Sequence, residues 1–208
     1  MDVAVPAITR LLLVRHGQTR TTRDGAFCGT TEVPLTEVGQ AQARALAERL
    51  RREHIDALYS SPQQRAHETA APIATALNLE IQTHSALREM NFGEWEDRRR
   101  ADLAHEQPNA LALWDRSSWK AHPPGGETLQ EATARIVGCV SGLLDMHAGQ
   151  TLLIVSHKSI LRLLICHLLD MPLSGARLLE ISPASLSELR VIDDQVQLFL
   201  HNDTTHLF

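Results

Sequence analysis

The sequence has few aromatic residues, few cysteines and no excess of positive charge. Aromatic side chains make up 4% of the 208 residues, so the core of the folded chain must be built from aliphatic side chains. Lysine and arginine total 20 against 25 aspartates and glutamates, which gives a net charge of −5. A general nucleic-acid-binding protein would carry a basic excess, so we expect no nucleic-acid partner. A small anion held by a few local arginines is still compatible with this charge.

Two further absences restrict the class of protein. The cysteines, Cys28, Cys139 and Cys166, lie far apart and form no C-x-x-C pair, which argues against a disulfide framework and a cysteine zinc site. No basic segment followed by a long apolar stretch opens the sequence, and no apolar run approaches the ~20 residues that span a bilayer. We therefore expect a cytoplasmic protein without a membrane span; its oligomeric state cannot be predicted.

Short apolar runs alternate with segments of helical periodicity. The expected strands are residues 11–14, 55–59, 79–83 and 151–156, followed by a hairpin of 185–192 with 196–201 around Asp193 and Asp194. Helices are expected over 36–53 with Thr36 as N-cap, 62–77 with Pro62 in the first turn, 98–120 with a break at Pro108, 129–146 and 158–170, whereas 18–35 and 84–97 look irregular. This alternation predicts one α/β domain over residues 1–208 with a mainly parallel sheet.

Polar residues follow three of the expected strands. Arg15 and His16 follow the first strand, Arg65 lies one helical turn beyond the second, and His157 follows the strand at 151–156. Ligands of open α/β sheets bind beyond the carboxyl ends of the strands. If these strands are parallel neighbours, two histidines and two arginines meet at one edge of the sheet.

Such a set suits a phosphate monoester. Guanidinium groups match phosphate oxygens, and a histidine ring nitrogen can attack phosphorus to give a phosphohistidine that water then hydrolyses. The second histidine, protonated beside the phosphate, would add a positive donor. Glu89, in the irregular stretch, is the candidate acid for the leaving oxygen, because a nearby dianion would raise the pKa of its carboxyl group.

Each residue alone also has an ordinary structural explanation. His157 can cap a carbonyl at a strand end, Arg65 can be a solvated helix residue, and Glu89 can be a surface carboxylate. Their joint placement favours a functional site. A metal hydrolase with His16, His157 and Glu89 as ligands is a rival hypothesis, although the two arginines would repel a dication. A phospho-ligand binder without catalysis is the other rival.

Seven motifs closely resemble those of the histidine phosphatase superfamily, whose fold is phosphoglycerate-mutase-like, and they occur in the family's order over essentially the whole chain. They are LLLVRHGQT (11–19), GTTEVPLTEVGQAQA (29–43), YSSPQQRAHETAAPIA (59–74), LREMNFGEWE (87–96), PPGGET (123–128), IVSHKSILRLLICHLL (154–169) and HNDTTHL (201–207). The resemblance implies a three-layer α/β/α sandwich that needs no metal and no organic cofactor. It also implies that His16 is the nucleophile, that Arg15, Arg65 and His157 form the phosphate pocket, and that Glu89 is the proton donor.

The chain departs from the family pattern at three places. Thr22 stands where the family often has an asparagine that touches the phosphate, and its hydroxyl can still donate. Ala26 stands where an arginine is common. Lys158 replaces a common glycine after the second histidine; its backbone N–H can still face the phosphate, and its side chain either points to solvent or adds charge near the pocket.

The motifs FGEWE (92–96) and PPGGE (123–127) resemble the phosphatase branch, including broad-specificity and α-ribazole phosphatases. The L-N-K run and the arginine pair of the mutase branch are missing. We therefore expect a phosphatase that hydrolyses small phosphate monoesters, with 2,3-bisphosphoglycerate-dependent phosphoglycerate mutase as the alternative. Other candidates for contact with the distal part of a substrate, each more simply explained as solvated or buried, are Arg98–Arg100, Arg116, Lys120, His122, Trp95, Trp114 and Trp119.

Overall fold

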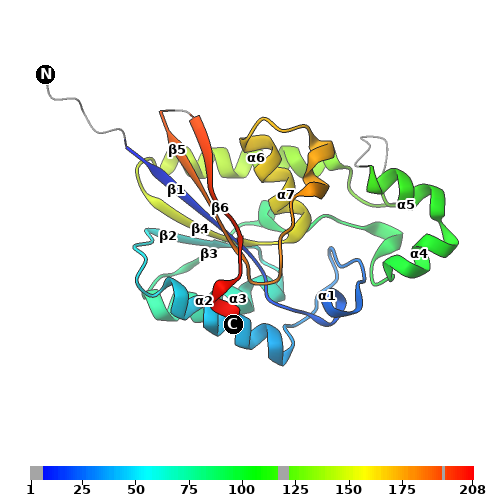
Figure 1. Ribbon diagram of the computed structural model, residues 1–208, viewed down its shortest axis with the longest axis horizontal. Helices are drawn as coiled ribbons and strands as arrows, with labels where there is room; N and C mark the ends of the chain where they lie inside the picture. Colours follow the sequence, from blue (N-terminus) through cyan, green and yellow to red (C-terminus); the bar gives the residue numbers. More distant parts are fainter. Residues whose placement is uncertain (1–6, 117–121, 194) are drawn as a thin grey trace, which may run out of the picture.

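A six-stranded sheet with the strand order β3-β2-β4-β1-β5-β6 forms the centre of the computed structural model, which describes residues 7–116, 122–193 and 195–208 (Figure 1). Strands β1 to β4 are parallel to one another, whereas β5 runs antiparallel to β1 and β6 antiparallel to β5. The strands are β1 (Thr9–Arg15), β2 (Ala57–Ser60), β3 (Ile81–Thr83), β4 (Thr151–Ser156), β5 (Leu186–Ile192) and β6 (Gln195–Asp203). The predicted α/β class and mainly parallel sheet are confirmed.

Helices cover both faces of this sheet. In Figure 1, α2 (Glu37–Leu50) and α3 (Gln64–Leu77) lie below it, and α6 (Leu129–Met146) and α7 (Lys158–Leu168) lie above it. Helices α1 (Arg20–Asp24), α4 (Arg100–Glu106) and α5 (Pro108–Asp115) gather at one end. The short 3-10 turns are η1 (Ser85–Leu87), η2 (Gly93–Trp95), η3 (Leu173–Leu178) and η4 (Thr205–Leu207). This arrangement is the three-layer sandwich that the sequence predicted.

The apolar run of β1 supplies both halves of the core. Leu11 and Leu13 pack between the sheet and helices α6 and α7, whereas Leu12 and Val14 pack between the sheet and helices α2 and α3. All four side chains are buried. A strand covered on both faces has no polar side to alternate with, and each such side chain contributes roughly 1.5–3 kcal/mol by its burial. The buried strand therefore fixes the position of Arg15 and His16, which follow it.

Two local predictions were wrong. The segment 18–35, expected to be loop, contains α1, which starts with a capping box between Thr19 and Thr22. The helix expected from Pro62 begins two residues later, after the N-cap Gln63, whose side chain makes no capping hydrogen bond. Trp119, Lys120 and Asp194 lie outside the described residues. No helix in the described part of the chain is both long enough and apolar enough to cross a bilayer.

The first turn of α2 lies directly against the chain that follows His16. A Cβ atom built on Gly39 would lie 2.1 Å from the carbonyl oxygen of Gln18. The backbone nitrogen of Gln18 would lie 2.9 Å away. Because both of these atoms belong to the backbone and cannot move aside, we expect Gly39→Ala to lower the free energy of unfolding by about 1–3 kcal/mol in urea denaturation. Gly138→Ala in α6, where nothing lies within 4 Å of the new Cβ, is the matched control and should stabilise by up to about 1 kcal/mol. Equal effects of the two substitutions would contradict this prediction.

Candidate active site

Three parallel strands end side by side and bring the predicted residues to one edge of the sheet. His16 follows β1, and its backbone N–H donates to the Ser156 carbonyl of β4 at 3.0 Å. Ser61 follows β2, and its backbone N–H donates to the Val155 carbonyl, also at 3.0 Å. His157 follows β4 directly and is the N-cap of α7. The strand ends therefore meet as the sequence predicted.

The ring of His16 is held through one nitrogen, and the other has no hydrogen-bond partner among the described residues. Its Nδ1 lies 2.8 Å from the carbonyl oxygen of Gly17, and because a carbonyl only accepts, Nδ1 carries the proton and Nε2 keeps its lone pair. The residue is buried, with 4% of its surface exposed, and it lines a cavity. Burial and then the charges of Arg15 and Arg65 hold the pKa of His16 well below its usual value. The ring is therefore neutral, the state in which Nε2 can act as a nucleophile.

Arg15 has hydrogen-bonding capacity to spare. Its Nη1 donates to the Ile181 carbonyl at 2.7 Å, but its Nε is buried and has no partner among the described residues. Burial lowers the pKa of Arg15 to about 10, which still leaves it charged at neutral pH. A buried cation with an unused donor in a cavity wall is costly unless an anion arrives to accept from it. Arg15 is thus suited to bind a phosphate.

Arg65 and His157 form a second unit behind His16. Arg65, in the first turn of α3, donates from Nε to Nδ1 of His157 at 3.3 Å. Since Nδ1 accepts, the proton lies on Nε2, which is 2.8 Å from the hydroxyl of Ser61. The rings of His157 and His16 are 5.1 Å apart between centroids. Arg65 and His157 are fully buried and do not line the cavity themselves.

The ring of His157 is neutral in the free protein. Burial, followed by the charges of Arg65 and His16, holds the pKa of His157 well below its usual value. The free protein therefore has a neutral His157, whereas sequence reasoning placed a protonated ring beside the phosphate. A dianion close by would raise this pKa, so the positive charge depends on the ligand.

Glu89 is a buried carboxyl group that faces the cavity. Its backbone N–H donates to Oε1 of Gln63 at 2.8 Å, which ties it to the start of α3. Its carboxylate oxygens accept from the backbone N–H groups of Met90 (2.9 Å) and Ser159 (3.1 Å). Burial raises the pKa of Glu89 in spite of these bonds and of nearby arginines. The sequence argument relied on the charge of the phosphate for this shift, but in the free protein burial already causes it.

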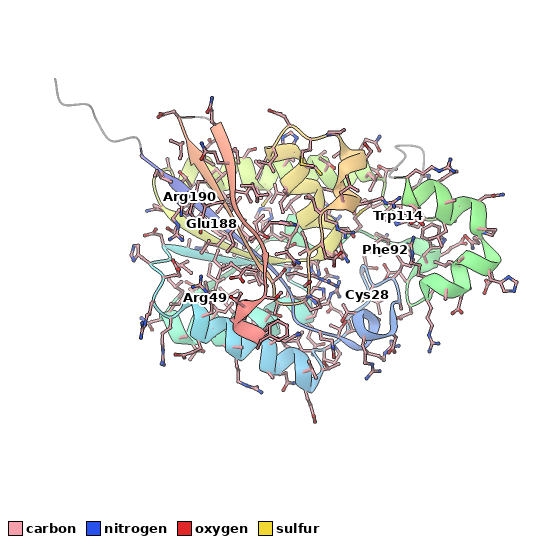
Figure 2. All side chains as sticks on the ribbon, in the orientation of Figure 1. Cys28, Arg49, Phe92, Trp114, Glu188 and Arg190 are labelled. Atoms are coloured by element: carbon pink, nitrogen blue, oxygen red, sulfur yellow. The ribbon has the colours of Figure 1, made fainter. Side chains whose placement is uncertain are left out.

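The cavity beside these residues has a volume of about 310 Å³, which is within the range of sites for small molecules. One wall is apolar, and Phe92 and Trp114 meet there edge to face with ring centroids 5.8 Å apart. Figure 2 shows these two side chains near α5 and Cys28 beside α1. The cations that line the cavity are Arg15, Arg100, Lys158, Arg162 and Arg177. Among the described lining residues, Glu89 is the one carboxylate.

Thr22 and Lys158 both line the cavity, but their polar groups already have partners. The hydroxyl of Thr22 donates to the Thr19 carbonyl at 2.9 Å and accepts from the Thr19 N–H at 2.8 Å. The ammonium group of Lys158 lies 2.9 Å from the carboxylate of Glu180. Of the two orientations left open for Lys158, the structure has the one that adds charge near the pocket.

Sequence reasoning missed a segment that holds the site from the other side. In residues 179–184, the Ile181 carbonyl accepts from Arg15, and the Ala184 N–H donates to the carbonyl of Arg15 at 3.0 Å. The C-terminal motif holds this segment in turn, because Asn202 Oδ1 accepts from the Ser182 N–H at 2.6 Å and His206 Nε2 donates to the Ala184 carbonyl at 3.1 Å. The sequence signal was the HNDTTHL motif itself, to which no role had been given.

Of the arginines and tryptophans named as candidates for substrate contact, some make only structural contacts and others line the cavity. Arg98 pairs with Glu106, whereas Arg100 pairs with Asp115 and also lines the cavity. Trp95 is buried in the core, and its ring nitrogen donates to Gln107 at 2.9 Å. Trp114 lines the cavity. Arg100 and Trp114 are therefore the two of this group placed to meet a substrate.

Comparison with known proteins agrees with this geometry. Residues 11–204 match the model of the histidine phosphatase superfamily (branch 1). Phosphoserine phosphatase 1 of Hydrogenobacter thermophilus is 32% identical over 200 residues, covering 96% of this chain and 95% of the relative. Adenosylcobalamin/alpha-ribazole phosphatase of Salmonella typhimurium is 39% identical over 163 residues, covering 78% and 81%. A mycobacterial glucosyl-3-phosphoglycerate phosphatase, solved with VO3, superposes with a TM-score of 0.86 at 27% identity, covering 94% and 99%.

The strand ends of this α/β sandwich bring two histidines and two arginines to one anion-binding edge. This fold and site are those of a class of phosphoryl-transfer enzymes. Within it, the chain belongs to branch 1 of the histidine phosphatase superfamily. It is a phosphoric monoester hydrolase that acts on small phosphomonoesters.

Proposed function

We propose that hydrolysis proceeds through a phosphohistidine on His16. The Nε2 lone pair attacks phosphorus while the bond from phosphorus to the ester oxygen breaks. The carboxyl group of Glu89 gives its proton to the leaving oxygen, so the product leaves as a neutral alcohol. Arg15, which lines the cavity, stabilises the charge on the phosphoryl oxygens, and the buried charge of Arg65 with His157 supports it from behind His16.

Water completes the cycle. The Glu89 carboxylate accepts a proton from a water molecule whose oxygen attacks phosphorus, and the bond from phosphorus to Nε2 breaks. Phosphate leaves, and His16 and Glu89 return to their starting states. One observation carries this proposal: His16, with Nδ1 bonded to Gly17 and no partner on Nε2 among the described residues, lines the same cavity as Arg15, whose Nε is unused, and the buried Glu89.

Trapping of the intermediate tests the proposal. The protein is mixed with an aryl phosphate labelled at phosphorus, quenched in alkali and digested. We expect label on the peptide that contains His16, stable in alkali and released by acid. Label that survives acid, or that maps to a serine or threonine, would overturn the proposal.

Activity should be independent of added metal. The rival metal hydrolase would need His16, His157 and Glu89 as ligands, but His157 already uses both ring nitrogens with Arg65 and Ser61. Among the described residues, no group of three or more histidine, cysteine, aspartate or glutamate side chains is placed to hold a metal ion. We expect kcat/KM to change by less than about twofold after dialysis against EDTA. Loss with EDTA and recovery with zinc would favour the metal hydrolase.

The family and its relatives support a small phosphorylated metabolite as the substrate. The family match over residues 11–204 also supports one domain over residues 1–208. The names of the relatives suggest α-ribazole 5′-phosphate, phosphoserine and glucosyl-3-phosphoglycerate as first candidates. A comparison of kcat/KM over these esters, sugar phosphates and nucleotides identifies the preferred one. A phosphoglycerate mutase assay with 2,3-bisphosphoglycerate runs beside it, and mutase turnover faster than hydrolysis would overturn the phosphatase assignment.

A further inference from the structure

Two cations of α7 share one carboxylate at the edge of the cavity. Lys158 Nζ lies 2.9 Å from Oε1 of Glu180, and Arg162 Nη2 lies 3.2 Å from Oε2. Lys158 and Arg162 are four residues apart, so they project from the same face of the helix. A carboxylate-shaped position between an ammonium and a guanidinium group therefore already exists in this protein.

The two sides of this contact differ in exposure. The side chains of Arg162 and Lys158 are 20% and 32% exposed, whereas that of Glu180 is 60% exposed. Both cations line the cavity, but Glu180 does not. The cations are thus part of the site, and their carboxylate partner reaches them from the solvent side. Because the carboxylate of Glu180 is mostly exposed, returning it to solvent costs little free energy when another carboxylate takes its place.

Arg162 also donates from Nε to the Leu179 carbonyl at 2.5 Å, and its Nη2 is the group that faces the carboxylate of Glu180. Arg15 and His16 belong to the phosphoryl end, and Arg162 lies farther along α7, by about 6 Å of helix rise from Lys158. Burial lowers the pKa of Lys158 and Arg162, while Glu180 opposes the shift of both. Removing Glu180 without a replacement would leave two partly buried positive charges unpaired, which is unfavourable. A ligand that displaces Glu180 must therefore bring its own negative charge.

We propose that Arg162, with Lys158, binds a carboxylate on the alcohol part of the substrate, and that Glu180 is the internal counter-ion which this carboxylate displaces. The inference rests on the proposed function, because it takes the phosphoryl end at His16 as given. It defines the preferred substrate class as phosphate monoesters with a carboxylate a few bonds from the ester oxygen.

Two matched pairs of substrates test this inference on the full chain. O-phosphoserine and phosphoethanolamine differ by one carboxylate, and so do 3-phosphoglycerate and glycerol 1-phosphate, in which a hydroxymethyl group replaces it. We expect the wild-type kcat/KM to be at least about tenfold higher for the carboxylate member of each pair, the size of one charge-assisted contact. A ratio near one would overturn the inference.

Variants locate the effect. Arg162→Met removes the charge and keeps much of the side-chain length, and it should bring both ratios to within about twofold of one. Glu180→Gln removes the competing charge and should raise both ratios about threefold or more through a lower KM for the carboxylate member. Arg44→Met, at an exposed arginine of α2 outside the cavity, is the matched control and should leave the ratios unchanged.

Because each result is a ratio within one variant, a general loss of stability does not imitate it. An equal loss on both members of a pair in Arg162→Met would mean that Arg162 only supports the fold, and the inference would be wrong. If no phosphate monoester is hydrolysed by the wild type, the proposed function itself fails and the inference falls with it. If all four esters are hydrolysed with equal kcat/KM, the inference is wrong and the proposed function still holds.

Discussion

Replacement of His16 by alanine should lower kcat for an aryl phosphate by at least about 10⁴-fold, because it removes the nucleophile on which both half-reactions depend. The labelled phosphoenzyme should disappear in the same variant. Steady-state release of phosphate and alkaline quenching measure the two effects. Turnover close to that of the wild type would refute the assignment of His16.

A matched variant and a binding measurement separate chemistry from folding. His67 lies on the exposed face of α3, outside the cavity, and His67→Ala should retain full activity. His16→Ala should still bind inorganic phosphate through Arg15, seen as a rise in Tm with phosphate concentration. If His16→Ala lost the response to phosphate as well, its inactivity would report a collapsed pocket. The same experiment tests the rival of a binder without catalysis, for which labelling of the wild type would be absent.

The features that the sequence predicted are those set by local patterns. The continuous apolar runs of β1 and β4 require a sheet covered on both faces, and the parallel pairing of these two strands places Arg15, His16 and His157 at one edge. Thr36 was predicted as an N-cap because a hydroxyl before an amphipathic segment satisfies a free N–H, and it accepts from Gly39. The break at Pro108 followed from the missing N–H of proline, and α5 begins there.

The wrong helix start at Pro62 has a functional cause. The hydroxyl of Ser61 lies 2.8 Å from His157, and the hydroxyl of Ser60 donates to the carbonyl of Ser61. The Ser61 hydroxyl thus contacts the site as well as the Gln63 N–H, from which it accepts at 3.3 Å, and α3 begins at Gln64. A local rule is broken where the chemistry needs the same side chain.

Long-range pairing could not be predicted in the same way. Arg162 lies in α7 and Glu180 in the loop after η3, and nothing in their flanking residues indicates that they meet. The position of Arg162, four residues after Lys158, was the one available hint, since residues at this spacing share a helix face. The role of Thr22 was also hidden, because the sequence cannot tell a hydroxyl facing phosphate from one used in a capping box with Thr19.

Glu89→Gln should lower kcat for an alkyl phosphate by about 10²–10⁴-fold, because an amide cannot transfer a proton to the leaving alkoxide. The loss should be much smaller for p-nitrophenyl phosphate, whose leaving group departs without a proton. Glu94→Gln, at an exposed carboxylate in the same motif, is the matched control and should behave as the wild type on both esters. Equal losses on the two esters in Glu89→Gln would contradict the role of Glu89 as the acid.

The pH dependence gives an independent test, since the signs of both limbs follow from the site. Burial raises the pKa of Glu89, so its proton is present below that raised pKa and lost as the pH rises through it. Burial and the two arginines lower the pKa of His16, so the neutral ring is lost only when the pH falls well below 6.5. For an alkyl phosphate, kcat/KM should therefore fall at both ends. In Glu89→Gln the alkaline limb should vanish while the acid limb stays, and an alkaline limb that survived would belong to another group.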